Sequence, residues 1–193
     1  MTALVYLHGF RSSPASIKAK RLRAYVDALP SRRTLHVPQL HHRPAVAMQN
    51  VVEWVERYAR DGVAFVGSSL GGFYATCLAE RFGARAAMIN PAVRPYEALA
   101  TSLGVQTNLY TGEVFEVTRE HMDELRALAV ARITRPERYF LLVETGDEVL
   151  DYREAVAFYG GACQYVRGGG DHTFTDFESQ IPAILRFAGV EIG

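Results

Sequence analysis

The sequence has no excess of charge of either sign. Its 193 residues include 21 lysines and arginines and 21 aspartates and glutamates, so the formal net charge is zero. A chain without net charge has no overall electrostatic attraction to nucleic acid, anionic membranes or acidic polymers. We therefore predict no nucleic-acid partner and no membrane partner.

Cysteine is scarce, and no group of side chains has the spacing of a metal site. Cys77 and Cys163 are the only cysteines, and both lie in apolar stretches, so we expect both to be buried. His41 and His42 are adjacent, which points their side chains in different directions, and no nearby His or Cys completes a ligand set. We expect neither a metal ion nor an organic cofactor.

Long apolar runs are also missing. None approaches the roughly 20 residues that cross a bilayer, and residues 1–9 lack the cationic start and the cleavage site of a secretion signal. We therefore expect a cytoplasmic protein. The chain length and an apolar content of 49% favour one domain, residues 1–193, with a single continuous core.

What the sequence does contain is an alternation of short apolar runs with longer stretches of helical period. We expect strands near residues 3–7, 34–37, 63–66, 86–89, 138–143 and 163–166. Helices are expected near residues 16–29, 45–60, 71–82, 151–159 and 174–187. This alternation predicts an α/β fold with a doubly wound, mainly parallel sheet of about six strands.

Residues 91–136 interrupt the alternation. They contain prolines, glycines and a helical stretch near 118–131, but no run that predicts a strand. We favour a lid over the substrate site, and a crossover helix with a loose approach is the alternative. Six apolar side chains of this insertion, together with Phe10 and Phe73 from outside it, either wall a shallow pocket or belong to the core: Tyr96, Leu99, Leu103, Leu109, Tyr110 and Phe115.

One sequence motif predicts a reactive side chain. Gly67-Ser68-Ser69-Leu70-Gly71 follows the predicted strand 63–66 and precedes a helical stretch. In a sharp strand-to-helix turn, the central serine is exposed, and the residues two positions away must be small. This context predicts Ser69 as a nucleophile, with Gly67 and Gly71 as the supporting small residues.

The remaining groups of an acyl-transfer site follow from this turn. The N–H of Leu70 is one expected oxyanion donor, and that of Phe10, after the first strand, is the second. His8 is expected to brace the same loop by hydrogen bonding. His172 follows the last predicted strand and three glycines, so it is the candidate general base, and a helix-capping role is its alternative.

Two aspartates compete for the role of the acid, because both follow the strand 138–143. Asp147 lies in the turn after Gly146, where a carboxylate can reach the far nitrogen of the histidine. Asp151 precedes Glu154 by three residues, the pattern of a helix N-cap. We favour Asp147.

Five segments in order resemble the YqiA/YcfP-like family of bacterial esterases. They are 6–10 with 12–14, 67–72, 90–95, 145–153 and 169–172. The resemblance implies an α/β-hydrolase fold, hydrolysis of short acyl esters or thioesters, and Ser69, Asp147 and His172 as a catalytic triad. One departure is Asp171, where the family usually has asparagine.

These observations predict a serine esterase whose partner is a small-molecule acyl ester. The alternatives are an acyl-CoA or acyl-carrier thioesterase with the same triad, and a binding protein that kept the fold without catalysis. A cationic run is either a solvated helix face, which we favour, or a site for the phosphates of coenzyme A or for an acidic carrier: Arg11, Lys18, Lys20, Arg21, Arg23, Arg32 and Arg33.

Overall fold

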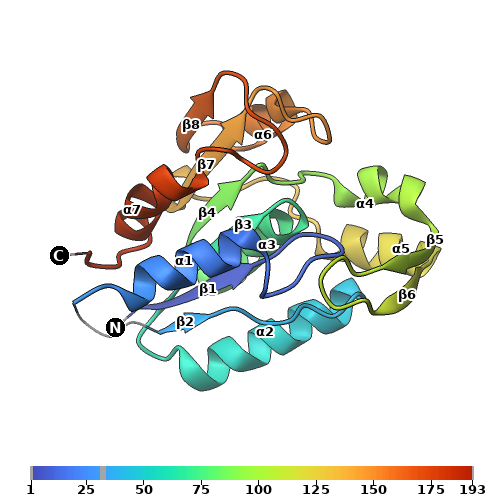
Figure 1. The fold of residues 1–193 in the computed structure, drawn as a ribbon, viewed down its shortest axis with the longest axis horizontal. Helices are drawn as coiled ribbons and strands as arrows, with labels where there is room; N and C mark the ends of the chain where they lie inside the picture. The colour runs from blue at the N-terminus through green and yellow to red at the C-terminus, as the bar shows by residue number, and fades with distance from the viewer. Residues whose placement is uncertain (1, 31–33, 193) are drawn as a thin grey trace.

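A parallel sheet forms the centre of the molecule (Figure 1). The computed structural model describes residues 2–30 and 34–192. Its six-stranded sheet has the order β2-β1-β3-β4-β7-β8, and every neighbouring pair is parallel. The strands are β1 Ala3–Leu7, β2 Leu35–His36, β3 Val63–Ser68, β4 Arg85–Ile89, β7 Tyr139–Glu144 and β8 Cys163–Arg167. The predicted fold class is confirmed.

Helices cover both faces of this sheet. The helices α1 Ile17–Asp27 and α7 Phe177–Phe187 pack on one face. The other face carries α2 Pro44–Tyr58, α3 Leu70–Phe82, α5 Arg119–Leu128 and α6 Tyr152–Phe158. Successive strand residues point to opposite faces. Leu4 and Tyr6 therefore pack in the core under α1 and α7, while Val5 and Leu7 pack in the core on the other face. Each such buried side chain stabilises the fold by about 1.5–3 kcal/mol.

The insertion contains strands that its sequence did not predict. After the short helix α4 Pro95–Ala98 and the 3-10 helix Leu99–Ser102, β5 Gly104–Thr107 pairs with β6 Val114–Val117 in an antiparallel hairpin. The expectation of no strand here was wrong. Four-residue strands show too little periodicity to be recognised, and this pair is stabilised by its own ladder and not by the central sheet.

The tip of this hairpin is hydrogen-bonded to the loop after β1. Leu109 N donates to Arg11 O at 2.9 Å, and Arg11 Nε donates to Thr107 O at 2.9 Å. Asn108 Nδ2 donates to Ser12 O at 2.8 Å. The insertion and the loop after β1 therefore share one hydrogen-bond network.

The two cysteines differ in their surroundings. Cys77 is buried in α3, where burial raises its pKa to about 12, as expected for an unreactive thiol. The expectation of burial was wrong for Cys163, which is exposed. Cys163 begins β8, and β8 is the edge strand of the sheet, so neighbouring strands protect it on one side only.

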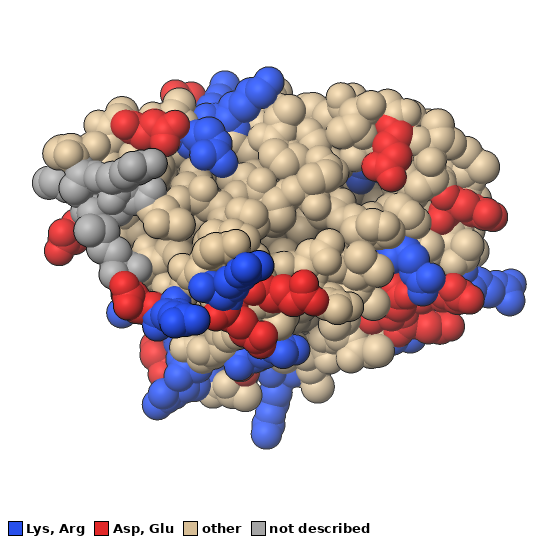
Figure 2. All heavy atoms as spheres, turned by 90° about the horizontal axis from the view of Figure 1, so that it is seen from below, with Lys and Arg blue, Asp and Glu red and all other residues tan. Residues whose placement is uncertain are grey.

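The surface carries both signs of charge. On the face drawn in Figure 2, lysine and arginine side chains alternate with aspartate and glutamate around an uncharged area. In the part of the chain that the structure describes, no helix is long and apolar enough to span a bilayer.

Candidate active site

The candidate site lies where the strand order reverses. β1 pairs with β2 on one side and with β3 on the other. The loops leaving the carboxyl ends of β1 and β3 therefore diverge, and open α/β sheets bind their ligands in the resulting crevice. Ser69 follows β3 and Gly9 follows β1, and a Cβ placed on Gly9 would lie 3.3 Å from Ser69 Cβ.

Ser69 occupies a strained turn that only glycine neighbours permit. Its φ is 57° and its ψ is −122°, an unusual conformation for a residue with a side chain. A Cβ on Gly67 would lie 2.1 Å from Gly71 O, and a Cβ on Gly71 would lie 2.0 Å from Leu7 O. Both distances are far below contact, so the strand, the turn and the loop after β1 fit together only with glycine at these positions.

Three predicted side chains meet at this turn. His172 Nε2 lies 3.1 Å from Ser69 Oγ. On the other side of the imidazole, Nδ1 lies 2.9 Å from Asp147 Oδ2 and 3.0 Å from Oδ1. A serine, a histidine and a carboxylate in this order have the geometry of an activated nucleophile.

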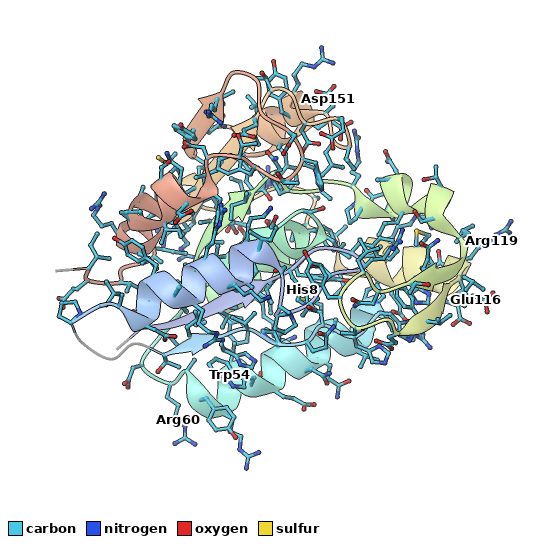
Figure 3. The ribbon with its side chains drawn as sticks, viewed as in Figure 1. His8, Trp54, Arg60, Glu116, Arg119 and Asp151 are labelled. Atoms are coloured by element: carbon cyan, nitrogen blue, oxygen red, sulfur yellow. The ribbon has the colours of Figure 1, made fainter. Side chains whose placement is uncertain are left out.

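Asp147 and Asp151 occupy different environments. The Asp147 side chain is 2% exposed, and its Oδ1 also accepts from Val149 N and Leu150 N, both at 2.9 Å. Burial raises the pKa of Asp147, but the hydrogen bonds from His172 and the two backbone N–H groups outweigh it, so the pKa lies below its ordinary value. Asp151 caps α6 through Arg153 N, as expected, and lies at the outer edge of the molecule beside that helix (Figure 3).

The two expected oxyanion donors line the cleft beside Ser69. Leu70 is the first residue of α3, so its N–H has no partner within the helix. Among the described residues, no acceptor is found for this N–H or for that of Phe10. His8, near the middle of the molecule in Figure 3, is buried, and its Nε2 accepts from Leu40 N at 3.2 Å while Nδ1 lies 3.0 Å from Gly9 O.

Glu144 is a functional candidate that the sequence analysis missed. This carboxylate at the end of β7 is fully buried. It accepts hydrogen bonds from five groups of β8 and the loop that carries His172: Arg167 Nη1 at 2.6 Å, Thr175 Oγ1 at 2.8 Å, Thr175 N at 2.9 Å, Asp171 N at 3.0 Å and Asp176 N at 3.3 Å. Burial raises the pKa of Glu144, but these donors outweigh it and hold the pKa below its ordinary value.

Three further side chains hold the backbone at His172. Asn90, in the left-handed region with φ 40°, donates through Nδ2 to Asp171 O at 3.0 Å and to His172 O at 3.2 Å. Its Oδ1 accepts from Glu144 N at 3.0 Å. Glu148 accepts from His172 N at 2.9 Å, and Lys18 Nζ donates to Thr173 O at 2.6 Å. The loop that carries His172 is thus fixed from β4, β7 and α1.

Ser69 opens into a cleft of about 770 Å³. Half of the predicted apolar wall lines it, namely Phe10, Leu99, Leu109 and Tyr110. The other half does not line the cleft, and for three of its residues the core alternative holds. Phe73, Tyr96 and Phe115 pack against the core, and Leu103 is exposed outside the cleft. Phe73 lies on α3, Tyr96 on α4 and Phe115 on β6, whereas Leu103 lies between the 3-10 helix and β5.

The other histidines are engaged away from Ser69. His42 Nδ1 lies 3.2 Å from His121 Nε2, and His121 Nδ1 accepts from Thr118 N at 3.2 Å. His36 stacks on Trp54 with ring centroids 4.0 Å apart. Within residues 2–30 and 34–192, no group of three or more His, Cys, Asp or Glu side chains is arranged to hold a metal ion.

Solved structures share this fold. The alpha/beta hydrolase domain-containing protein 10 from mouse matches with a TM-score of 0.75 at 17% identity, over 97% of this chain and 89% of the mouse chain. Est1E from Butyrivibrio proteoclasticus gives a TM-score of 0.69 at 14% identity, over 96% of this chain and 86% of its own. The monoacylglycerol lipase of Paleococcus ferrophilus gives a TM-score of 0.69 at 14% identity, over 97% of this chain and 95% of the lipase chain. At these identities the likeness shows the α/β-hydrolase fold.

The sequence itself matches a family model along nearly its whole length. Residues 3–189 fit the model described as Uncharacterised protein family (UPF0227). The match includes every segment on which the resemblance to the YqiA/YcfP-like proteins rests. The chain therefore belongs to UPF0227, the YqiA/YcfP family.

Proposed function

We propose that this protein is a serine hydrolase that cleaves carboxylic esters through an acyl-enzyme. The observation that carries the proposal is the continuous contact from Ser69 Oγ through His172 to the buried carboxylate of Asp147. The esterase and lipase named among the structures of the same fold support the same reaction class. The contact between the three side chains favours catalysis over a binding protein that lost its activity.

The proposed reaction has two halves. Ser69 Oγ attacks the ester carbonyl while His172 Nε2 takes its proton, and the N–H groups of Leu70 and Phe10 bind the negative oxygen that forms. His172 then gives the proton to the leaving alcohol. A water molecule, deprotonated by His172, attacks the acyl-enzyme and releases the acid and Ser69. Asp147 holds the imidazole in the required tautomer throughout.

Labelling by a fluorophosphonate tests the nucleophile. We expect the wild-type protein to be labelled and Ser69→Ala to lose the label completely, because only an activated serine attacks phosphorus quickly. Intact-mass spectrometry measures the adduct. The matched control is Ser68→Ala, which removes the neighbouring hydroxyl and should label like the wild type. An unlabelled wild type would instead favour the binding protein, and a labelled Ser69→Ala would refute the nucleophile.

We also propose a preference for short acyl groups. Apolar residues at the cleft rim are largely exposed: Ile17 63%, Leu109 70% and Val149 60%. A fully buried methylene contributes about 0.8 kcal/mol, and one lying along such an open rim contributes less. Added methylenes beyond the enclosed floor of the cleft therefore bring little binding energy.

The preference is checked with p-nitrophenyl esters from acetate to palmitate. We expect kcat/KM to be highest for the short acyl groups, acetyl to butyryl, and to fall for longer chains. Measurements below the critical micelle concentration keep the comparison free of aggregation. A steady rise of kcat/KM up to palmitate would show that the whole cleft encloses the acyl chain.

A further inference from the structure

The charged side chains that line the cleft have one sign. Arg11, Lys18 and Arg21 line it, and among the described lining residues there is no aspartate or glutamate. Asp147 lies behind His172, with 2% of its side chain exposed. This contrasts with the zero net charge of the chain and with the mixed charges in Figure 2. A cleft lined by one sign concentrates ligands of the opposite sign.

The same part of the cleft contains the start of α1. The N–H groups of the first turn of a helix lack internal partners and favour negative charge. Ser16, the N-cap residue, lines the cleft, is 8% exposed and makes no capping hydrogen bond. Its Oγ has no partner with hydrogen-bond geometry, although the Tyr6 hydroxyl lies nearby. Polar groups without partners therefore accompany the cations.

The existing partners of the three cations leave them able to bind an anion. Lys18 Nζ and Arg11 Nε donate to backbone carbonyls, and these carry no net charge. Arg21 has a carboxylate partner, Glu178, at 3.5 Å, but both side chains are about half exposed or more, and such pairs are weak. Burial lowers the pKa of Lys18 to about 8, and the charges of Asp171, Glu144 and Asp147 act in the opposite direction, so the ammonium group is still charged at neutral pH.

The position of α1 relative to His172 indicates which part of the substrate is charged. Lys18 contacts the backbone of Thr173, the residue after His172. In the proposed reaction, His172 gives its proton to the leaving group, so the leaving group lies on this side of Ser69. We propose that the cleft binds a carboxylate or phosphate on the leaving group through Lys18 and Arg21. Arg11 adds to the positive electrostatic potential of the cleft. This inference rests on the proposed hydrolase function.

The structure also divides the cationic run of the sequence. Lys20 and Arg23 do not line the cleft, although they lie on the same helix as Lys18 and Arg21. Arg32 and Arg33 lie outside the described residues. Lys20 is exposed and therefore supplies a matched control for the removal of one positive charge from α1.

The test compares two acetate esters whose leaving groups differ in charge. These are 4-carboxyphenyl acetate and the neutral 4-carbamoylphenyl acetate. For the wild type we expect a ratio of kcat/KM, anionic over neutral, of about ten, which falls as NaCl is raised. The ratio should fall about threefold in Arg21→Gln and in Lys18→Met, and stay unchanged in Lys20→Gln. Because a ratio is compared, any general loss of activity from a shifted His172 loop cancels.

Two outcomes would overturn the inference. One is a kcat/KM ratio near one in the wild type. The other is a ratio as high as that of the wild type in a variant combining Arg11→Gln, Lys18→Met and Arg21→Gln. A second pair of esters, p-nitrophenyl hydrogen succinate and p-nitrophenyl butyrate, places the charge on the acyl group. A larger charge preference for this pair would refute the leaving-group assignment.

Binding without turnover separates this inference from the proposed function. We expect 4-hydroxybenzoate and phenyl phosphate to bind Ser69→Ala in calorimetry and to bind severalfold more weakly once Arg21→Gln is added. The tighter of the two probes identifies carboxylate or phosphate as the preferred anion. Such binding without any ester hydrolysis by the wild type would refute the hydrolase and support the anion site. Ester hydrolysis by the wild type without such binding would support the hydrolase and refute the anion site.

Discussion

Replacing Asp147 with asparagine is expected to lower kcat by about 10³–10⁴-fold while the fold remains intact. The carboxylate accepts a hydrogen bond from His172 Nδ1, which leaves Nε2 unprotonated and able to take the proton of Ser69. An asparagine amide can donate to Nδ1 instead, which favours the wrong tautomer. Steady-state kinetics on p-nitrophenyl acetate give kcat, and circular dichroism checks the fold.

Asp151→Asn is the matched control, because it makes the same chemical change four residues further along. Asp151 caps α6 and pairs with Arg153, and it has no contact with His172. Asparagine is also a good N-cap residue, so we expect near-normal kcat and a loss of a few tenths of a kcal/mol in the free energy of unfolding. The assignment of the acid would be reversed by normal turnover in Asp147→Asn together with a collapse in Asp151→Asn.

Replacing Glu144 with glutamine is expected to reduce the free energy of unfolding by about 3 kcal/mol and kcat by about 10²-fold. Every group that contacts this buried carboxylate is a donor. A glutamine places an NH₂ group against some of these donors in either amide orientation, so buried donors lose their acceptor. The loop then shifts, and His172 moves relative to Ser69.

Urea denaturation measures the stability change, and kinetics at a temperature where both proteins are folded measure the catalytic change. Glu137→Gln is the control, because Glu137 is exposed and pairs only with Arg135 in the described structure. A positioning role predicts that KM stays nearly constant while kcat falls. Unchanged kcat in folded Glu144→Gln would show that the carboxylate contributes to stability alone.

Much of the architecture follows from local sequence. The strand 3–7 was located to the residue, and the other central strands to within two residues, because parallel strands buried on both faces form short apolar runs between helices. The turn at Ser69 was recognisable because close backbone packing admits only glycine at 67 and 71. In both cases the constraint acts within a few residues, so it leaves a local pattern.

The features that could not be predicted from the sequence depend on contacts between distant segments. Glu144 resembles any polar residue at the end of a strand, and its burial follows only from the loop that folds over it. Asn90 is 54 residues from Glu144 along the chain and more than 80 from the carbonyls it binds. The exposure of Cys163 likewise depends on the place of β8 at the sheet edge. No local pattern encodes these relations.

The hydrogen bonds between the β5–β6 hairpin and residues 11 and 12 limit how freely this scaffold can be engineered. Exchanging the insertion for that of another protein of the α/β-hydrolase fold is an obvious way to alter specificity. Here the segment to be exchanged also supports the loop that carries Phe10. In the proposed mechanism, a graft would therefore change transition-state stabilisation together with substrate choice, unless the donor sequence keeps an equivalent of Asn108 and the backbone path at Leu109.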